Sequence, residues 1–136
     1  MRRFAKALSL ATVLALPLAN TVAAATSTAK KTVWKRVSGP QEQADRWGYV
    51  QVSVVVKKTT VGSKTTRKIT GITVPVYPDH TGRSQFISEN ALPILISEGL
   101  KAQMHPANIQ MLSGATYTSE AFEQSLQAAV LKAKKA

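Results

Sequence analysis

Alternating valines in residues 47–57 place the strongest constraint on how this chain folds. Val50, Val52, Val54 and Val56 would share one face of an extended strand, with Gln51 and Ser53 on the other face. Such a strand needs an apolar layer over one side and neighbouring strands to satisfy its main chain. The chain has 136 residues, which allows one domain with its own core.

A second strand of the same kind, residues 67–77, follows a segment rich in Lys and Thr. Gly62-Ser63 lies between the two strands and predicts the turn of a long basic hairpin. A two-residue loop there would place Val52 opposite Thr73 and put the two apolar sets on opposite faces. One residue of slip brings the sets together, so we predict a bulge or an odd-length loop near the tip. Pro75 predicts that the second strand lies at an edge or bends.

A helix is predicted over residues 88–103, after a loop at residues 77–85. The helix carries an apolar stripe at helical spacing. Pro93 fits if the regular helix starts near Asn90, because the first turn has no N–H partners to lose. The stripe consists of Ala91, Leu92, Leu95, Ile96 and Leu100.

The strongest helix signal lies at residues 120–133. Thr118 is a good N-cap, and Tyr117 and Phe122 fit a hydrophobic staple around it. Lys residues fill the last turn, as the helix dipole favours. A short apolar run at 109–112 predicts a strand before this helix. An antiparallel sheet with two helices packed on one face makes the predicted fold class α+β.

The seven residues between the predicted short strand and the last helix form the candidate binding site. A tight turn with glycine and a helix that opens in hydroxyl groups suit a phosphate, because the helix start presents unpaired N–H groups and a partial positive charge. The simpler alternative is a turn with an N-cap, and no Walker spacing is present. The candidate cofactor-binding residues are Ser113, Gly114, Ala115, Thr116, Tyr117, Thr118 and Ser119.

The string SGATYTS, followed by EAFEQSLQAAVLKA, resembles the end of the FMN-binding domain family. Upstream, WGYVQV at 47–52 resembles the family's entry strand, and SENALPIL at 88–95 resembles its first helix. The family includes subunits of sodium-pumping and ferredoxin-linked membrane redox complexes and many small secreted flavoproteins. The resemblance covers about residues 45–135, and it implies an FMN-binding domain at 47–136 with FMN as the cofactor.

In several family members the last Thr of this element carries FMN through a phosphoester bond formed by a flavin transferase, which implies Thr116 as the flavin-bearing residue. Flavinylated members usually have Asp three residues before the Ser, where this chain has Gln110. Gln keeps the hydrogen bonding but lacks the charge, so covalent and non-covalent attachment both stay open. For the flavin ring, Tyr117 is the nearest aromatic residue in sequence, and Trp47 and Tyr49 are further candidates; ordinary core packing is the alternative for each.

Residues 1–25 are expected to be a secretory signal, because three basic residues precede an apolar run and small residues follow it at 23–25. A retained membrane anchor is the alternative. Residues 26–46 are expected to form a polar basic linker, with one short strand near 32–37. The chain has no Cys and so no disulfide. The expected location is exported: extracellular, cell-surface or periplasmic.

The formal net charge of the full chain is +11, of which +8 remains outside the expected signal. Such a chain is attracted to anionic surfaces, whether cell-wall polymers, lipid headgroups or acidic redox partners. Solvated surface charge is the simpler alternative. Nucleic acid is not an expected partner, because an exported protein rarely meets it and no aromatic residues interleave with the hairpin cations, as single-strand binders require.

Metal and hydrolytic chemistry find little support. Asp79 and His80 are adjacent without a third ligand, His105 stands alone, and no Ser–His constellation is apparent. The expected function is an exported, membrane-associated FMN flavoprotein that carries electrons from a membrane redox partner or reductase to an external acceptor. A redox carrier is favoured over a stand-alone enzyme. The alternative is a cofactor-free basic binding module that adheres to anionic cell-surface polymers.

Overall fold

The computed structural model describes residues 28–136, so the expected signal at 1–25 lies outside the described residues. Residues 31–136 form one unit, in which antiparallel strands come first and helices follow, which confirms the α+β class. The strands are β1 (Lys30–Ser38), β2 (Glu42–Gln43), β3 (Tyr49–Val61) and β4 (Lys64–Val76); the α-helices are α2 (Gly82–Ala102) and α3 (Thr116–Lys135); the 3-10 helices are η2 (Asp45–Trp47) and η3 (Pro106–Asn108).

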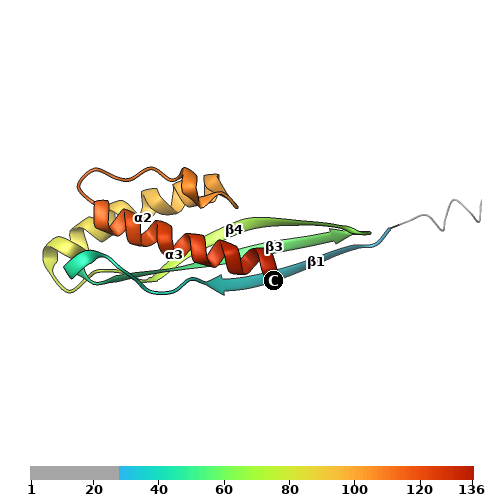
Figure 1. Cartoon of the computed structure of the whole chain (residues 1–136), viewed down its shortest axis with the longest axis horizontal. Coiled ribbons are helices and arrows are strands. Elements are labelled where there is room, and N and C mark those ends of the chain that lie inside the picture. Colours follow the sequence, from blue (N-terminus) through green and yellow to red (C-terminus); the bar gives the residue numbers. More distant parts are fainter. Residues whose placement is uncertain (1–27) are drawn as a thin grey trace, which may run out of the picture. The chain divides into compact units, whose positions relative to one another are not determined.

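The central strand of the sheet is β3 (Figure 1). β4 pairs with one of its edges, and β1 and β2 follow one another along the other edge. The short strand expected near 32–37 is present as part of β1, but the expected linker at 26–46 is incorrect from Lys30 onward, because both β1 and β2 belong to the sheet. β4 is an edge strand among the described residues, as Pro75 predicted, and its register shifts beside that proline.

The break between β1 and β2 is closed by a serine of α3. The Gly39 N–H donates to the main-chain oxygen of Val52 at 2.8 Å, and the N–H of Val52 donates to Ser125 Oγ at 2.9 Å. Ser125 Oγ in turn donates to the main-chain oxygen of Pro40 at 2.7 Å. A Cβ at Gly39 would overlap the main-chain oxygen of Ser125, so only glycine allows this close approach.

The hairpin of β3 and β4 turns at Gly62-Ser63, as predicted. Val61 lies opposite Lys64, so the loop has two residues and regular pairing continues from it. Gly62 has a φ of +62°, a conformation in which glycine is favoured. The expected bulge or odd-length loop near the tip is therefore wrong in its position.

A bulge farther down the hairpin supplies the slip that the apolar pattern requires. The register shifts by one residue between Val55 and Val56. Val56 lies opposite Ile69, and beyond the shift Val54 lies opposite Ile72. The valines of β3 and the isoleucines of β4 thereby share the buried face of the sheet.

Helix α2 begins at Gly82 rather than at Ser88, because a capping box precedes it. Ser84 N donates to Thr81 Oγ1 at 3.0 Å, and Thr81 N donates to Ser84 Oγ at 3.1 Å. The expected loop at 77–85 is correspondingly shorter. Pro93 lies in the interior of the helix and not in its first turn, on an exposed position of its surface.

Both α-helices pack on the same face of the sheet, α3 along β3 and α2 beside β4 (Figure 1). Gly99 of α2 lies where this helix meets β4 and α3: a Cβ there would be 2.7 Å from Ile72 Cδ1 and 3.2 Å from Leu126 Cδ2. No helix within residues 28–136 is long and apolar enough to cross a bilayer. The larger core side chains are Val50, Val52, Val54, Val56, Ile69, Ile72, Leu92, Leu95, Phe122, Leu126 and Val130.

Candidate functional site

The hydroxyl-rich segment forms a tight turn and the first turn of α3. Gly114 has a φ of +84°, which favours glycine, and it lies with Ser113 at the exposed tip of the turn. α3 then begins at Thr116, with Ala115 as its N-cap residue. An alanine has no side-chain acceptor, so this helix start lacks a side-chain cap.

The uncapped start leaves main-chain donors available. The N–H groups of Thr116, Tyr117 and Thr118 have no acceptor among the described residues. The side chains of Ser113 and Thr116 are exposed beside them. Unpaired N–H groups, hydroxyl donors and the positive end of a helix dipole therefore meet at one place, which is the arrangement that binds a phosphate.

The predicted details of this helix start are wrong. Thr118 is not the N-cap; it lies within the first turn and is 5% exposed. Tyr117 is a helical residue with 51% exposure, so it cannot form the expected staple with buried Phe122. Residues 109–112 do not pair as a strand. The differences at Tyr117 and Thr118 share one cause, because the helix starts four residues before Glu120 and includes both residues.

Ser119 supports the loop from within the fold. Its side chain is fully buried, and its hydroxyl donates to the main-chain oxygen of Ala115 at 2.8 Å. The hydroxyl oxygen of Ser119 also accepts from the N–H of Leu112 at 3.2 Å. Of the seven candidate residues, Ser119 is the one whose hydroxyl is already used to hold both sides of the turn.

A small hollow of about 40 Å³ lies on one side of the loop. Thr116, Tyr117 and Thr118 line it from α3, and Trp47 faces them from η2. The structure therefore brings together two of the three aromatic residues expected near the flavin, Trp47 and Tyr117. The third, Tyr49, is exposed on β3 and does not line this hollow. A space of this size accommodates a small group rather than a three-ring system.

A larger hollow of about 350 Å³ lies on the other side of the loop, against α2. Ser113, Gly114 and Ala115 form one wall. Phe86 and Ile94 on α2 are apolar and well exposed, at 67% and 49%. Its volume falls in the range of small-molecule sites, and apolar walls beside a few polar groups are typical of such sites.

The residues of α2 that line the larger hollow were not predicted from the sequence. Phe86 lies outside the helix predicted from residue 88, and Ile94 belongs to neither its apolar stripe nor the core. The spacing of Phe86, Asn90 and Ile94, four residues apart, is the signal that marks one helix face, provided that the capping box at Thr81 is used to start the helix.

The two hollows contain no Lys, Arg, His, Asp or Glu among their lining residues. Arg83, at the start of α2, lines neither of them. An anion at the loop would therefore be held by neutral donors and the helix dipole. Within residues 28–136, no group of three or more His, Cys, Asp or Glu is placed to hold a metal ion.

Comparison with known protein families gives one match for the chain. A family model of the FMN-binding domain matches residues 46–131, which span β3, β4, α2, the candidate loop and most of α3. No curated protein and no solved structure gives a significant match. The matched residues include the whole candidate loop and both of its hollows.

Proposed function

The chain belongs to the FMN-binding domain family, and we propose that it is an exported flavoprotein that holds FMN at the loop of residues 113–119 and carries electrons. Membership of the family supports FMN as the cofactor. One observation of the structure carries the choice of site. The start of α3 has no cap, and its free N–H groups stand beside the exposed hydroxyls of Ser113 and Thr116.

The phosphate end of FMN suits this helix start. The N–H groups of Thr116, Tyr117 and Thr118 would donate to phosphate oxygens, and the helix dipole favours the negative charge. Gly114 leaves the approach open, since even a Cβ built there meets no atom within 4 Å. No basic side chain is needed, which agrees with the absence of Lys and Arg from the lining of the hollows.

The flavin ring suits the larger hollow beside the loop. Phe86 and Ile94 offer exposed apolar surface, and Asn90 between them offers an amide that can hydrogen-bond to a polar ring edge. FMN itself supplies the one- and two-electron chemistry. The chain's residues would orient the ring and exclude water from one of its sides. Contacts on one side only would leave the ring accessible to a redox partner.

We further propose that FMN is attached covalently to Thr116. The Thr116 side chain is exposed in the first turn of α3, within reach of both a bound phosphate and a flavin transferase. Gln110, in the place where flavinylated members usually have Asp, is also exposed and lines neither hollow. A phosphoester on Thr116 Oγ1 would keep the cofactor from being lost by dilution outside the cell.

The redox role needs partners of matching chemistry. A membrane-bound reductase would supply the electrons, and an external acceptor would remove them. The exposed aromatic and apolar residues at the loop end of the molecule, such as Phe86 and Tyr117, provide surface for such transient contacts.

The test is to express the full chain with a flavin transferase, purify it, and measure flavin absorbance before and after denaturation. The expected result is a mass increase of one FMN less one water, which the phosphoester bond eliminates, on the peptide that contains Thr116. Thr116→Ala should abolish this increase, whereas Ser113→Ala in the same exposed loop should keep it. Flavin that is released on denaturation would indicate non-covalent binding, and a colourless protein under ample FMN would overturn the proposal.

A further inference from the structure

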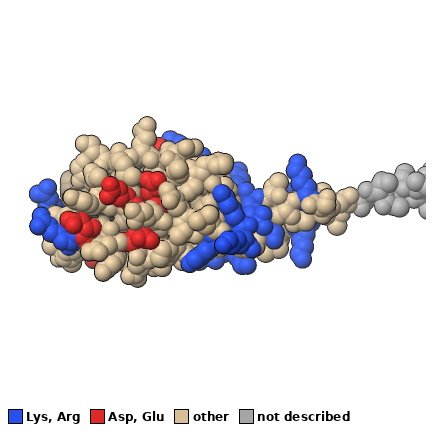
Figure 2. Space-filling view, viewed as in Figure 1, with Lys and Arg blue, Asp and Glu red and all other residues tan. Residues whose placement is uncertain are grey.

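Charge is divided between the two ends of the unit formed by residues 31–136. In Figure 2, the acidic side chains lie over the loop end, where a smaller group of Lys and Arg also lies, and most Lys and Arg gather toward the hairpin end. Residues 30–41, 50–70 and 124–136 together contain twelve Lys and Arg and no Asp or Glu. All seven acidic residues of the chain lie outside these three segments. The rest of the described part contains only three basic residues. We call the hairpin side the basic end.

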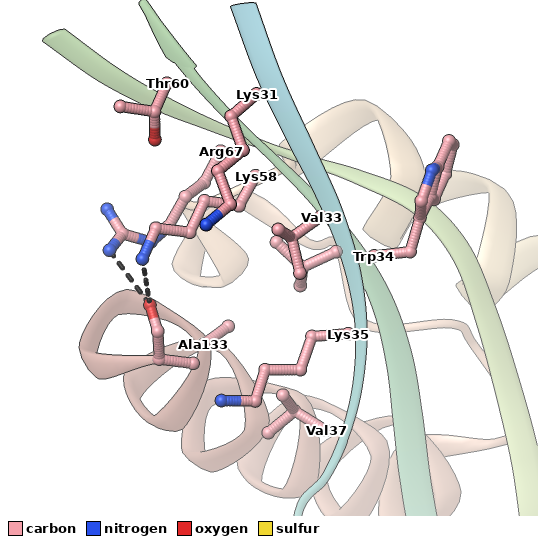
Figure 3. Close-up of a pocket in the computed structure, with 11 residues that line it drawn as sticks. Lys31, Val33, Trp34, Lys35, Val37, Lys58, Thr60, Arg67 and Ala133 are labelled. Atoms are coloured by element: carbon pink, nitrogen blue, oxygen red, sulfur yellow. Dashed lines mark hydrogen bonds between the residues drawn. The ribbon is translucent and has the colours of Figure 1, made fainter. Parts of the chain in front are cut away.

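The basic end contains a hollow of about 300 Å³ between β1, the hairpin and the C-terminal end of α3 (Figure 3). The hairpin extends past the end of α3, so the helix does not cover this part of the sheet (Figure 1). The apolar part of the wall is formed by Val33, Val37, Val56 and Ala133, and the cations at the hollow are Lys31, Lys35, Lys58 and Arg67.

Hydrogen-bond donors exceed acceptors inside this hollow. Lys58 Nζ and Arg67 Nη2 both donate to the main-chain oxygen of Ala136, at 3.3 and 3.0 Å (Figure 3). Arg67 Nε is buried and has no acceptor among the described residues. Two cations that converge on one oxygen, beside a buried donor without a partner, form a site that suits an anionic oxygen group.

The chain enters the unit at this same end. Ser38 Oγ lies 3.0 Å from Ser53 Oγ, and Lys57 Nζ lies over the Trp34 ring, 5.4 Å from its centroid. Strand β1 therefore runs antiparallel to β3, with its first residues beside the hairpin tip. The N-terminal sequence that precedes β1 includes the apolar run at 7–18.

We propose that the basic end is a docking surface for anionic phospholipid bilayers. Lys58 and Arg67 would bind a lipid phosphate in the hollow, and the apolar part of the lipid would contact Val33 and Val37. The remaining cations would add attraction to the anionic headgroups around it. Apolar walls beside converging cations favour a lipid over a soluble polyanion, which needs charge alone. This inference does not depend on flavin binding.

The first test measures flotation of the full chain with vesicles of phosphatidylcholine and with vesicles that also contain phosphatidylglycerol. Binding is expected only to the anionic vesicles and should weaken as salt is raised. The double variant Lys58→Gln/Arg67→Gln should bind roughly 25-fold more weakly, because each basic residue near the surface contributes about fivefold. The matched pair Arg46→Gln/Lys101→Gln removes the same charge outside the basic end and should change binding little. Equal binding to both vesicle types, or equal losses from the two pairs, would overturn the proposal.

Two further measurements separate lipid docking from general attraction to polyanions. Val33 and Val61 are both 43% exposed, but only Val33 lines the hollow. Val33→Thr should weaken vesicle binding about threefold by making the wall polar, while Val61→Thr should not. Binding to soluble polyphosphate should be weaker than to vesicles and unchanged by Val33→Thr. Tighter polyphosphate binding, or no effect of Val33→Thr on vesicles, would reject the lipid site.

Folding and cofactor content are checked in the same samples. Flavin absorbance of each variant should match the parent chain, and so should thermal unfolding, except for Lys58→Gln/Arg67→Gln, which loses the hydrogen bonds to Ala136. Because Arg67 is partly buried, Lys31→Gln/Lys35→Gln provides a second pair at exposed positions of the same hollow, with the same expected loss. A failure of vesicle binding with flavin retained would reject the docking surface and leave the proposed function standing.

Discussion

Ser119 and Leu112 are joined across the candidate loop: the buried hydroxyl oxygen of Ser119 accepts a hydrogen bond from the N–H of Leu112 at 3.2 Å. The hydroxyl also donates to the main-chain oxygen of Ala115 at 2.8 Å. One side chain therefore fixes the residues before and after the turn, and the exposed tip at Ser113 and Gly114 is held by a rigid base.

Replacing this hydroxyl should lower the stability of the fold. Ser119→Ala leaves the Leu112 N–H without its partner, and we expect the free energy of unfolding to fall by about 1–3 kcal/mol in urea titrations. Ser113→Ala changes an exposed serine of the same loop and should stay within about 0.5 kcal/mol of the parent. Equal effects of the two substitutions would contradict the structural role of Ser119.

Replacing two glycines that have open surroundings by alanine should change the stability of the fold in opposite directions. A Cβ meets no atom within 4 Å at either Gly114 or Gly82, but only Gly114 has a positive φ, of +84°. Gly114→Ala should therefore destabilise the chain by about 1–2 kcal/mol through backbone strain alone. Gly82→Ala lies at the first residue of α2 and should stabilise it by about 0.4–1 kcal/mol. Thermal unfolding measures both, and changes of the same sign would rule out the conformation described for Gly114.

The larger hollow should contribute to FMN affinity without contributing to stability. Phe86 is 67% exposed, so Phe86→Ser should leave the unfolding midpoint nearly unchanged while weakening non-covalent FMN binding by about tenfold, or about 1.4 kcal/mol. Leu131→Ser serves as the control, because Leu131 is 58% exposed on α3 and lines neither of the two hollows beside the loop. Flavin fluorescence titration of the two variants gives the comparison, and similar affinities would place the ring elsewhere.

Gly39, where the edge of the sheet meets α3, should not tolerate a larger residue. Gly39→Ala would drive a Cβ into the main-chain oxygen of Ser125, which cannot move without displacing α3, and we expect a loss of about 3 kcal/mol in the free energy of unfolding. At Gly71 the nearest atom to a Cβ is Val55 Cβ at 3.8 Å, an ordinary contact. Gly71→Ala should therefore cost less than about 1 kcal/mol. A stable Gly39→Ala variant would show that β1 and β2 do not pack against α3 as described.

The elements with strong local patterns could be predicted from the sequence. The alternation in residues 47–57 indicated β3, Gly62-Ser63 indicated the turn, and the amphipathic C-terminal segment indicated α3. The short strand expected near 32–37 lies within β1, but the full length of β1 and its place in the sheet could not be predicted, because its side chains are almost all exposed and show no apolar alternation. Its position depends on pairing with β3, which is a tertiary contact.

The position of the bulge and the start of α2 show where local reasoning falls short. The apolar pattern required a one-residue slip in the hairpin, but it did not decide between the tip and the site near Val55. The helix start depended on the capping box of Thr81 and Ser84, two short polar residues in a segment that also reads as a loop. Pro93 favoured a later start, although its exposed position lets the longer helix accommodate it.

The location of the candidate loop could be predicted from the sequence, but the burial of its side chains could not. The hydroxyl-rich loop was identified, but whether each hydroxyl points outward or inward follows from packing, which buries Ser119 and leaves Thr116 exposed. Phe86 and Ile94 reach the loop only because α2 packs beside it, and no local pattern connects residues so far apart in the chain.

Helix α3 also sets a height. It runs from the candidate loop to the basic end, and its 20 residues correspond to about 30 Å. If α3 stood perpendicular to a bilayer contacted by the basic end, the flavin would lie about that far above the headgroups. A redox enzyme confined to the membrane interior could not touch it, so only a donor with a domain that projects an equal distance into the solvent would be within reach.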